Sequence, residues 1–287
     1  MCRREGHDGN NNFHLCALLV AVLLLGACAS PLKPTPQPVS HTLGAPSRTA
    51  AWQPLLGNLP SARPASWFDA QDAGPDALFW RLASIDTATT SIDAQYFIWK
   101  LDAVGSLLLE RVLQAADRGV RVRLLLDDSF LSGEDMDLVA AAAHPNLEMR
   151  VFNPFQVRSS IMLARFLENL NDFERTNHRM HNKILVADNT VAVIGGRNIA
   201  DEYFGFSNKV NFRTFDVLTT GMVVPEISNS FDDYWNSGWA FPIESIDHKQ
   251  GTNDELVQLR KKLRVNYGVL DRWMSDNSIV NRNWGQH

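Results

Sequence analysis

The feature that most constrains the fold is a regular alternation of apolar, strand-like runs with helical segments between residues 75 and 152. Short loops join these segments. Two strands that are separated by a helix run parallel, whereas antiparallel strands can be joined by a tight hairpin. The alternation therefore predicts an α/β domain with a mixed, largely parallel β-sheet flanked by helices.

Local signals set the boundaries of the predicted elements. Pro75 suits the first turn of a helix, Gly119 ends a helix, and Ser132 suits an N-cap. The expected helices cover residues 75–84, 104–118, 132–143, 156–175, 199–204 and 254–270. The expected strands cover residues 91–99, 120–126, 147–152, 184–187, 191–194 and 215–218.

Composition excludes several classes of protein. The 287 residues are 45% apolar and 21% charged, which rules out a wholly disordered chain and a collagen-like fibre. The formal net charge is -5, and the only dense basic cluster is residues 260–264, so nucleic acid is an unlikely partner. The three cysteines are Cys2, Cys16 and Cys28, which leaves no thiol for a disulfide or a cysteine zinc site in the remaining chain. No cofactor is expected.

The first residues resemble a bacterial lipoprotein signal. The apolar run 15–25 is too short to span a bilayer and has the length of a signal-peptide core. Small residues and then Cys28 follow it. The resemblance implies that residues 1–27 are removed and that Cys28 is lipidated, which places the protein in the bacterial cell envelope on the periplasmic side. Ala29 favours the outer membrane. The alternative is a plain N-terminal membrane anchor with an incidental cysteine.

Residues 28–66 are predicted to form an extended tether. Seven prolines occur between residues 30 and 63, and such a segment has no core of its own. We expect the globular domain over residues 67–240 and a helical C-terminal extension over residues 241–287. Acylation of Cys28 by several chains would anchor the domain stably at a membrane.

A predicted hairpin carries the most informative polar residues. Runs 184–187 and 191–194 are apolar and are joined by a turn that begins at Asp188. His181 and Lys183 are two residues apart and therefore share one face of the strand, while Ile184 points the opposite way. An imidazole and an ammonium group side by side would suit a phosphate group.

The residues after the hairpin strengthen this prediction. Gly195 and Gly196 allow the backbone to approach a ligand closely. Asn198 is expected to cap the helix 199–204, whose N-terminus would attract an anion. We therefore expect His181, Lys183 and Asn198 to surround one phosphorus centre. Turn chemistry alone explains Asp188, so its role is structural first and supports the site second.

Each of these residues alone has an ordinary explanation as a surface, solvated or capping side chain; only their joint spacing favours a site. His178 lies near His181, but no acidic or thiol third ligand is nearby, so no metal site is expected. The spacing His181-x-Lys183-(x)4-Asp188-(x)6-Gly-Gly-x-Asn198 resembles the HKD signature of the phospholipase D superfamily. Many members carry Ser where Gly196 stands.

Residues 180–204 resemble the cardiolipin synthase branch of that superfamily, and the resemblance extends over about residues 95–239. It implies a single phospholipase D-like domain, one half of the usual two-lobed fold, that acts on phospholipid through a phosphohistidine. His181 would be the nucleophile. Lys183 and Asn198 would hold the phosphate oxygens. Asp216, on the next predicted strand, would orient His181 or would be an ordinary strand carboxylate.

The resemblance also requires a second histidine as proton donor. None of His144, His178, His248 and His287 heads another such string. The chain is then a truncated copy of a two-motif enzyme, a subunit of a homodimer that supplies one histidine per copy, or an inactive half. The expected activity is phosphatidyl transfer or phospholipid hydrolysis. The alternatives are a superfamily nuclease, which the acidic net charge disfavours, and a membrane-anchored anion-binding domain without activity.

Overall fold

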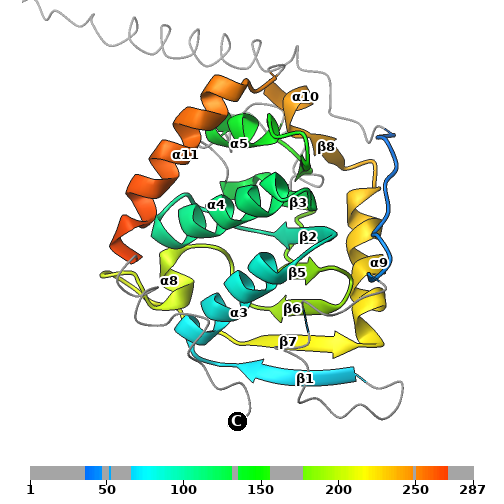
Figure 1. The fold of residues 1–287 in the computed structure, drawn as a ribbon, viewed down its shortest axis with the longest axis vertical. Helices are drawn as coiled ribbons and strands as arrows, with labels where there is room; N and C mark the ends of the chain where they lie inside the picture. Colours follow the sequence, from blue (N-terminus) through cyan, green and yellow to red (C-terminus); the bar gives the residue numbers. More distant parts are fainter. Residues whose placement is uncertain are drawn as a thin grey trace, which may run out of the picture.

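A single eight-stranded sheet forms the centre of the protein (Figure 1). The computed structural model describes residues 36–46, 52, 66–130, 135–155, 177–247 and 250–270. Several predictions lie outside these residues: the leader with Cys28, the N-cap Ser132, the helix 156–175, and the histidines His248 and His287. The strands are numbered in sequence order, and they lie across the sheet in the order β1-β7-β6-β5-β2-β3-β4-β8.

The strands are β1 (Ser66–Gln71), β2 (Ser91–Tyr96), β3 (Arg121–Asp127), β4 (Leu147–Phe152), β5 (Ile184–Ala187), β6 (Val191–Gly195), β7 (Asp216–Gly221) and β8 (Ala240–Pro242). The α-helices are α3 (Gly74–Thr87), α4 (Ala103–Asp117), α5 (Asp135–Ala142), α8 (Asp201–Phe204), α9 (Val223–Trp235), α10 (Ile243–Asp247) and α11 (Asn253–Tyr267). Short 3-10 helices cover Asp128–Phe130 and Gly268–Leu270. Among the described strands and α-helices, four were not predicted: β1, α9, β8 and α10.

The mixed α/β sheet is confirmed, but it is less parallel than predicted. Only β2–β3 and β3–β4 are parallel, and the other five pairings of the described strands are antiparallel. The parallel pairs are those whose connections contain α4 and α5. The remaining strands return by the β5–β6 hairpin or by connections that reverse the chain direction.

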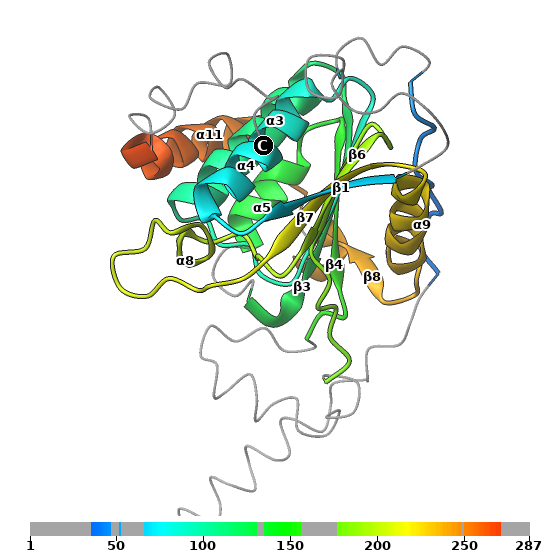
Figure 2. The same ribbon diagram turned by 90° about the horizontal axis from the view of Figure 1, so that it is seen from below.

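Helices cover both faces of the sheet unequally. In Figure 2, α3, α4, α5 and α11 lie on one side of the sheet and α9 lies on the other. Side chains alternate between these layers as the strand geometry requires. On β5, Leu185 joins the large core under α3 and α4, whereas Ile184 and Val186 pack with Val224 of α9. In the described part of the chain, no helix combines the length and the apolar character needed to cross a bilayer.

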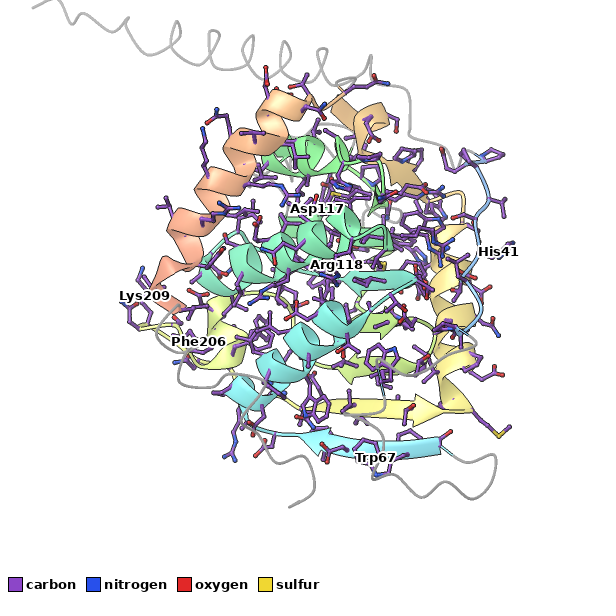
Figure 3. The ribbon with its side chains drawn as sticks, viewed as in Figure 1. His41, Trp67, Asp117, Arg118, Phe206 and Lys209 are labelled. Carbon is purple, nitrogen blue, oxygen red and sulfur yellow. The ribbon has the colours of Figure 1, made fainter. Side chains whose placement is uncertain are left out.

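Part of the predicted tether is bound to the domain. Three arginines of β3 and β4 each donate to a backbone carbonyl: Arg150 to Pro38 at 2.7 Å, Arg123 to Ser40 at 2.9 Å and Arg121 to His41 at 2.8 Å. We call residues 36–46 the strap; it runs along the outside of α9 (Figure 3, near His41). Arg123 also donates to the Thr42 hydroxyl at 3.0 Å, so both the backbone and the side chains of the strap are bound.

A buried ion pair lies under the strap. Arg123 donates to Asp93 at 2.7 and 2.9 Å and to Asp232 at 2.8 Å, and its guanidinium lies 4.8 Å from the ring centre of Phe231. Asp232 also accepts from the backbone N–H of Thr42 at 2.8 Å. The carboxylate of Asp232 therefore joins the strap, α9 and β3.

Replacement of Asp232 should loosen the strap and destabilise the domain. We expect Asp232→Ala to lower the free energy of unfolding by about 1–3 kcal/mol, because a buried donor of Arg123 and the Thr42 N–H lose their acceptor. Proteolysis within residues 36–46 should accelerate. The neighbouring Asp233 is exposed, so Asp233→Ala should stay within about 0.5 kcal/mol of the wild type in the same denaturant titration. Equal effects of the two substitutions would contradict this role.

Candidate active site

The strand directions bring the predicted site residues to one edge of the sheet. Strand β2 runs parallel to β3 and β4 and antiparallel to β5. The start of β5, the end of β6 and the start of β7 therefore meet the carboxyl ends of β2, β3 and β4. In α/β sheets, ligands bind outside the carboxyl ends of the strands.

His181 and Lys183 lie together on the ring of Phe97, just after β2. The imidazole centre is 4.7 Å from the Phe97 ring centre, and the Lys183 Nζ is 5.1 Å from it. Nζ also donates to the backbone carbonyl of His181. His181 is exposed, whereas Lys183 is only 4% exposed. The pair thus presents an accessible imidazole with a recessed ammonium group beside it.

Asn198 binds the residue that follows Phe97 and is not a helix cap. Its Oδ1 accepts from the N–H of Ile98 at 3.0 Å, and its Nδ2 donates to the Tyr203 hydroxyl at 2.9 Å. Helix α8 begins at Asp201, and its N-cap is Ala200. The predicted capping role was therefore wrong. These bonds use one of the two amide hydrogens, so Asn198 retains a second donor next to Phe97.

The start of α8 is already occupied by a carboxylate. Asp102 Oδ2 accepts from the N–H of Asp201 at 2.8 Å, and Asp201 Oδ1 accepts from the N–H of Val104 at 2.8 Å. Helices α4 and α8 thus cap each other. Burial raises the pKa of Asp102 to about 7. The expected attraction of a phosphate to this helix start is corrected, because Asp102 fills that position.

The glycine pair has a packing role, and its contact with a phosphate stays a prediction. Gly195 N–H donates to the Lys183 carbonyl at 3.3 Å, and Gly196 N–H donates to the Phe215 carbonyl at 2.9 Å. A Cβ atom at Gly195 would collide with Asp216, and one at Gly196 would collide with the Thr214 hydroxyl. Both residues are glycine because the chain before β7 passes directly over them.

Asp216 pairs with arginines and not with His181. It is fully buried, accepts from Arg81 Nη2 at 2.9 Å and from the Arg197 N–H at 3.1 Å, and lies 3.3 Å from Arg197 Nη1. Among the described residues, no hydrogen bond joins Asp216 to His181. The predicted orienting role is therefore wrong, because two buried guanidinium groups, one on α3 and one within the motif, claim this carboxylate.

Asp127 is the acidic residue that the sequence analysis missed. It is buried at the end of β3, accepts from the Met180 N–H at 2.9 Å and lies 3.5 Å from Arg179 Nη1. Met180 directly precedes His181, so this bond fixes the chain that carries the imidazole. A carboxylate directly at the carboxyl end of a parallel strand was the signal that could have identified it.

The electrostatic environment favours a neutral His181 beside a charged Lys183. Burial and then the Lys183 charge lower the pKa of His181 below its ordinary 6.5, while Asp127 opposes the shift. Burial lowers the pKa of Lys183 to about 8, again against Asp127. At pH 7 the His181 imidazole is therefore mostly neutral and carries a free lone pair, while Lys183 is mostly protonated. This combination suits a nucleophile beside an anion-binding group.

Asp188 lies at the opposite edge of the sheet. Its buried carboxylate accepts from the N–H groups of Thr89, Thr90 and Ser91 at 2.7–3.1 Å and from Trp52 Nε1 at 3.0 Å. Against the opposing effect of burial, these hydrogen bonds lower the pKa of Asp188. The residue stands at the far end of β5 from His181. It therefore fixes the hairpin to the start of β2 and touches no group at the candidate site.

The described residues do not place a second imidazole with His181. The His144 ring bonds Asp117 at 3.1 Å, and the His178 ring packs on Phe152 with 6.1 Å between centres. Within the described ranges, no group of three His, Cys, Asp or Glu side chains could hold a metal ion.

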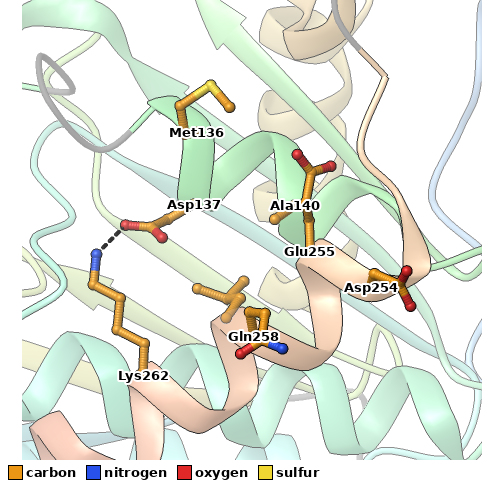
Figure 4. A pocket seen from close by; sticks show the side chains of 8 residues that line it. Met136, Asp137, Ala140, Asp254, Glu255, Gln258 and Lys262 are labelled. Atoms are coloured by element: carbon orange, nitrogen blue, oxygen red, sulfur yellow. Dashed lines mark hydrogen bonds and ion pairs between the residues drawn. The ribbon is translucent and has the colours of Figure 1, made fainter.

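A separate pocket of about 470 Å³ lies between α5 and α11, away from this edge. Figure 4 shows the Lys262–Asp137 ion pair at one side of it.

Comparisons with known proteins identify the family of the chain. The family model described as "Cardiolipin synthase, PLD-like domain" matches residues 82–235. Cardiolipin synthase C of Escherichia coli is 40% identical over 185 residues, which cover 64% of this chain and 38% of that protein. An uncharacterized protein of Helicobacter pylori is 37% identical over 195 residues, which cover 67% of this chain and 38% of the relative.

Among solved structures, Nuc from Salmonella typhimurium, a phospholipase D family member, aligns with a TM-score of 0.41 and 17% identity over 63% of this chain and 98% of Nuc. The chain belongs to the cardiolipin synthase family of phospholipase D-like domains. It spans less than half the length of the curated relatives described above.

The pKa of His181 should report the neighbouring charges. We expect its imidazole to titrate below pH 6.5 in a histidine NMR experiment. Lys183→Met should raise this pKa, because it removes a nearby positive charge, and Asp127→Asn should lower it further. Lys261→Met, on an exposed residue of α11, is the control and should leave the titration unchanged. Identical curves for all four proteins would contradict the arrangement.

Proposed function

We propose that this chain is a phospholipase D-type phosphodiesterase or phosphatidyl transferase that acts on phospholipid through a phosphohistidine at His181. The observation that carries the proposal is the accessible imidazole of His181 beside the recessed Lys183 ammonium group on Phe97. Membership of the cardiolipin synthase family supports a phospholipid phosphodiester as the substrate class.

The proposed reaction has two displacements. A ring nitrogen of His181 forms a bond to phosphorus, and the bond from phosphorus to the leaving alcohol breaks. Lys183 and the second amide hydrogen of Asn198 stabilise the negative charge on the phosphate oxygens. The leaving alkoxide takes a proton from an acid. Water or a lipid hydroxyl then attacks phosphorus, loses its proton and releases His181.

The proton donor is the open part of this mechanism. We propose that a histidine of a second copy, or of a further segment of a longer protein, supplies the proton, because the His144 ring bonds Asp117 and the His178 ring packs on Phe152. Substitution of this donor histidine should slow the first displacement, in which the leaving alcohol takes up a proton, more than the second. A protein that is active only as a dimer in size-exclusion chromatography would agree with a donor from the second copy.

Phosphatidylglycerol vesicles provide the direct test. Attack by His181 should release glycerol, and the phosphatidyl group should pass to water to give phosphatidic acid or to phosphatidylglycerol to give cardiolipin. His181→Ala should lower product formation at least about 10³-fold, as expected for loss of a nucleophile. The matched control is His41→Ala, whose side chain is 70% exposed on the strap, and it should retain wild-type activity.

A rapid alkaline quench followed by mass analysis should detect a phosphatidyl group on the peptide that contains His181. Folded protein without product, with His181→Ala and wild type alike, would contradict the proposal. Cleavage of single-stranded DNA without lipid turnover would favour the nuclease alternative. Binding of inorganic phosphate without either activity would favour an anion-binding domain.

We also propose that the chain is held at the periplasmic side of the bacterial envelope, with the outer membrane favoured, through a lipid on Cys28. The support is the apolar run 15–25 followed by small residues and this cysteine. Radiolabelled palmitate should enter the wild-type protein in cells and should be absent from Cys28→Ser. Equal labelling of both proteins would contradict lipidation at this position.

A further inference from the structure

The segment that joins α8 to β7 begins and ends at the candidate site. We call residues 205–215 the site loop. Just before it, the Tyr203 hydroxyl accepts from Asn198, and at its end the Phe215 carbonyl accepts from Gly196 at 2.9 Å. Figure 2 shows the loop projecting beyond α8 on this side of the molecule. Its middle part therefore stands at the edge of the sheet that carries His181.

Large apolar side chains face solvent on this loop. Val210, Phe212 and Phe215 are 58%, 50% and 51% exposed within six residues. Single exposed apolar residues are ordinary, but a cluster marks an interaction surface. The cluster is held in shape, because the Phe212 ring packs on Tyr203 with 5.0 Å between centres and its N–H donates to the Glu202 carbonyl at 2.7 Å.

The charges of the loop are positive. Lys209 directly precedes the apolar residues, Arg213 lies among them, and no Asp or Glu occurs from residue 203 to residue 215. Figure 3 shows Lys209 at the outer limit of the molecule. Arg213 has one acidic neighbour, Asp72 at 3.6 Å, and both side chains are largely exposed.

The carboxyl end of α11 carries further exposed apolar residues. That end lies on the same side of the molecule as the site loop in Figures 1 and 2. Val265 near the end of the helix and Val269 just beyond it are 79% and 76% exposed. Residues 264–270 contain no acidic residue either.

We propose that the site loop docks on an anionic phospholipid bilayer, with its apolar side chains in the outer acyl region and its cations at the phosphates. Apolar residues interleaved with cations are suited to such an interface. The inference deepens the proposed function, on which it rests for the substrate, because docking brings lipid phosphates to His181. A symmetric contact with a second copy would instead bring Lys209 and Arg213 towards the same residues of the partner, which like charges oppose.

Tryptophan quenching by brominated acyl chains tests the docking in the full chain. Phe212→Trp places a probe on the site loop. Met222→Trp is the matched control: Met222 is 60% exposed and directly follows β7, at the opposite edge of the sheet from Phe215. Each signal is read as the difference from the parent chain, which has eight tryptophans. Any attachment by residues 1–35 is common to all the variants and cancels.

In phosphatidylglycerol vesicles, the probe at position 212 should be quenched and the probe at position 222 should not. Phosphatidylcholine vesicles should give much weaker quenching at position 212. Adding Lys209→Ala should lower the ratio of docked to undocked protein about five-fold, as expected for one cation at an anionic surface. Circular dichroism should show unchanged folding of each variant.

Equal quenching of the two probes, or quenching at position 212 that does not depend on the anionic lipid, would overturn the proposal. Shielding of position 212 that rises with protein concentration in the absence of vesicles would instead identify a second copy as the occupant and would also overturn it. The His181→Ala variant separates this inference from the proposed function. This variant should keep the quenching at position 212 even though product formation is lost. If the wild type shows quenching but forms no product, the docking proposal stands and the proposed phosphohistidine chemistry is rejected.

Discussion

The antiparallel pairing of β5 with β2 is the constraint on which the candidate site depends. It places the residues before β5 over the residues after β2, so that Phe97 contacts both His181 and Lys183. A parallel pairing would carry His181 to the opposite edge, where Asp188 now lies. Asp188 helps to fix this direction, because its carboxylate binds the N–H groups that lead into β2. The motif thus contains both the proposed nucleophile and the residue that positions its strand.

Buried ion pairs hold the helices and strands around the candidate site in place. Arg81 and Arg197 neutralise Asp216, and Arg123 joins Asp93 to Asp232. Such pairs add little net stability relative to apolar packing, but each one is strongly unfavourable when a partner is missing. They therefore favour one arrangement of helix and sheet over its alternatives. One of these ion pairs also fixes the backbone of the candidate site, because the N–H of Arg197, between Gly196 and Asn198, donates to Asp216.

Local patterns predicted the central strands and the hairpin, because their apolar faces and turn residues are contiguous in sequence. The same patterns placed His181 and Lys183 together. They could not reveal the partner of Asp216, because Arg81 is 135 residues away, nor the displacement of Asn198 from its capping role, which depends on the distant Asp102. The short, half-exposed β1 and the three-residue β8 exist through pairing with their neighbours. Where a side chain has competing partners from distant segments, the sequence leaves the choice open.

The strap has a consequence for how the domain can be oriented. We define it from residue 36, which is eight residue-to-residue steps from Cys28, so the reach of the intervening chain is at most about 28 Å. An attachment at Cys28 would act as a short tether whose nearest bound residue is Pro38, held by Arg150 of β4. Simultaneous docking of the site loop would then keep the start of the strap within that reach of the bilayer surface.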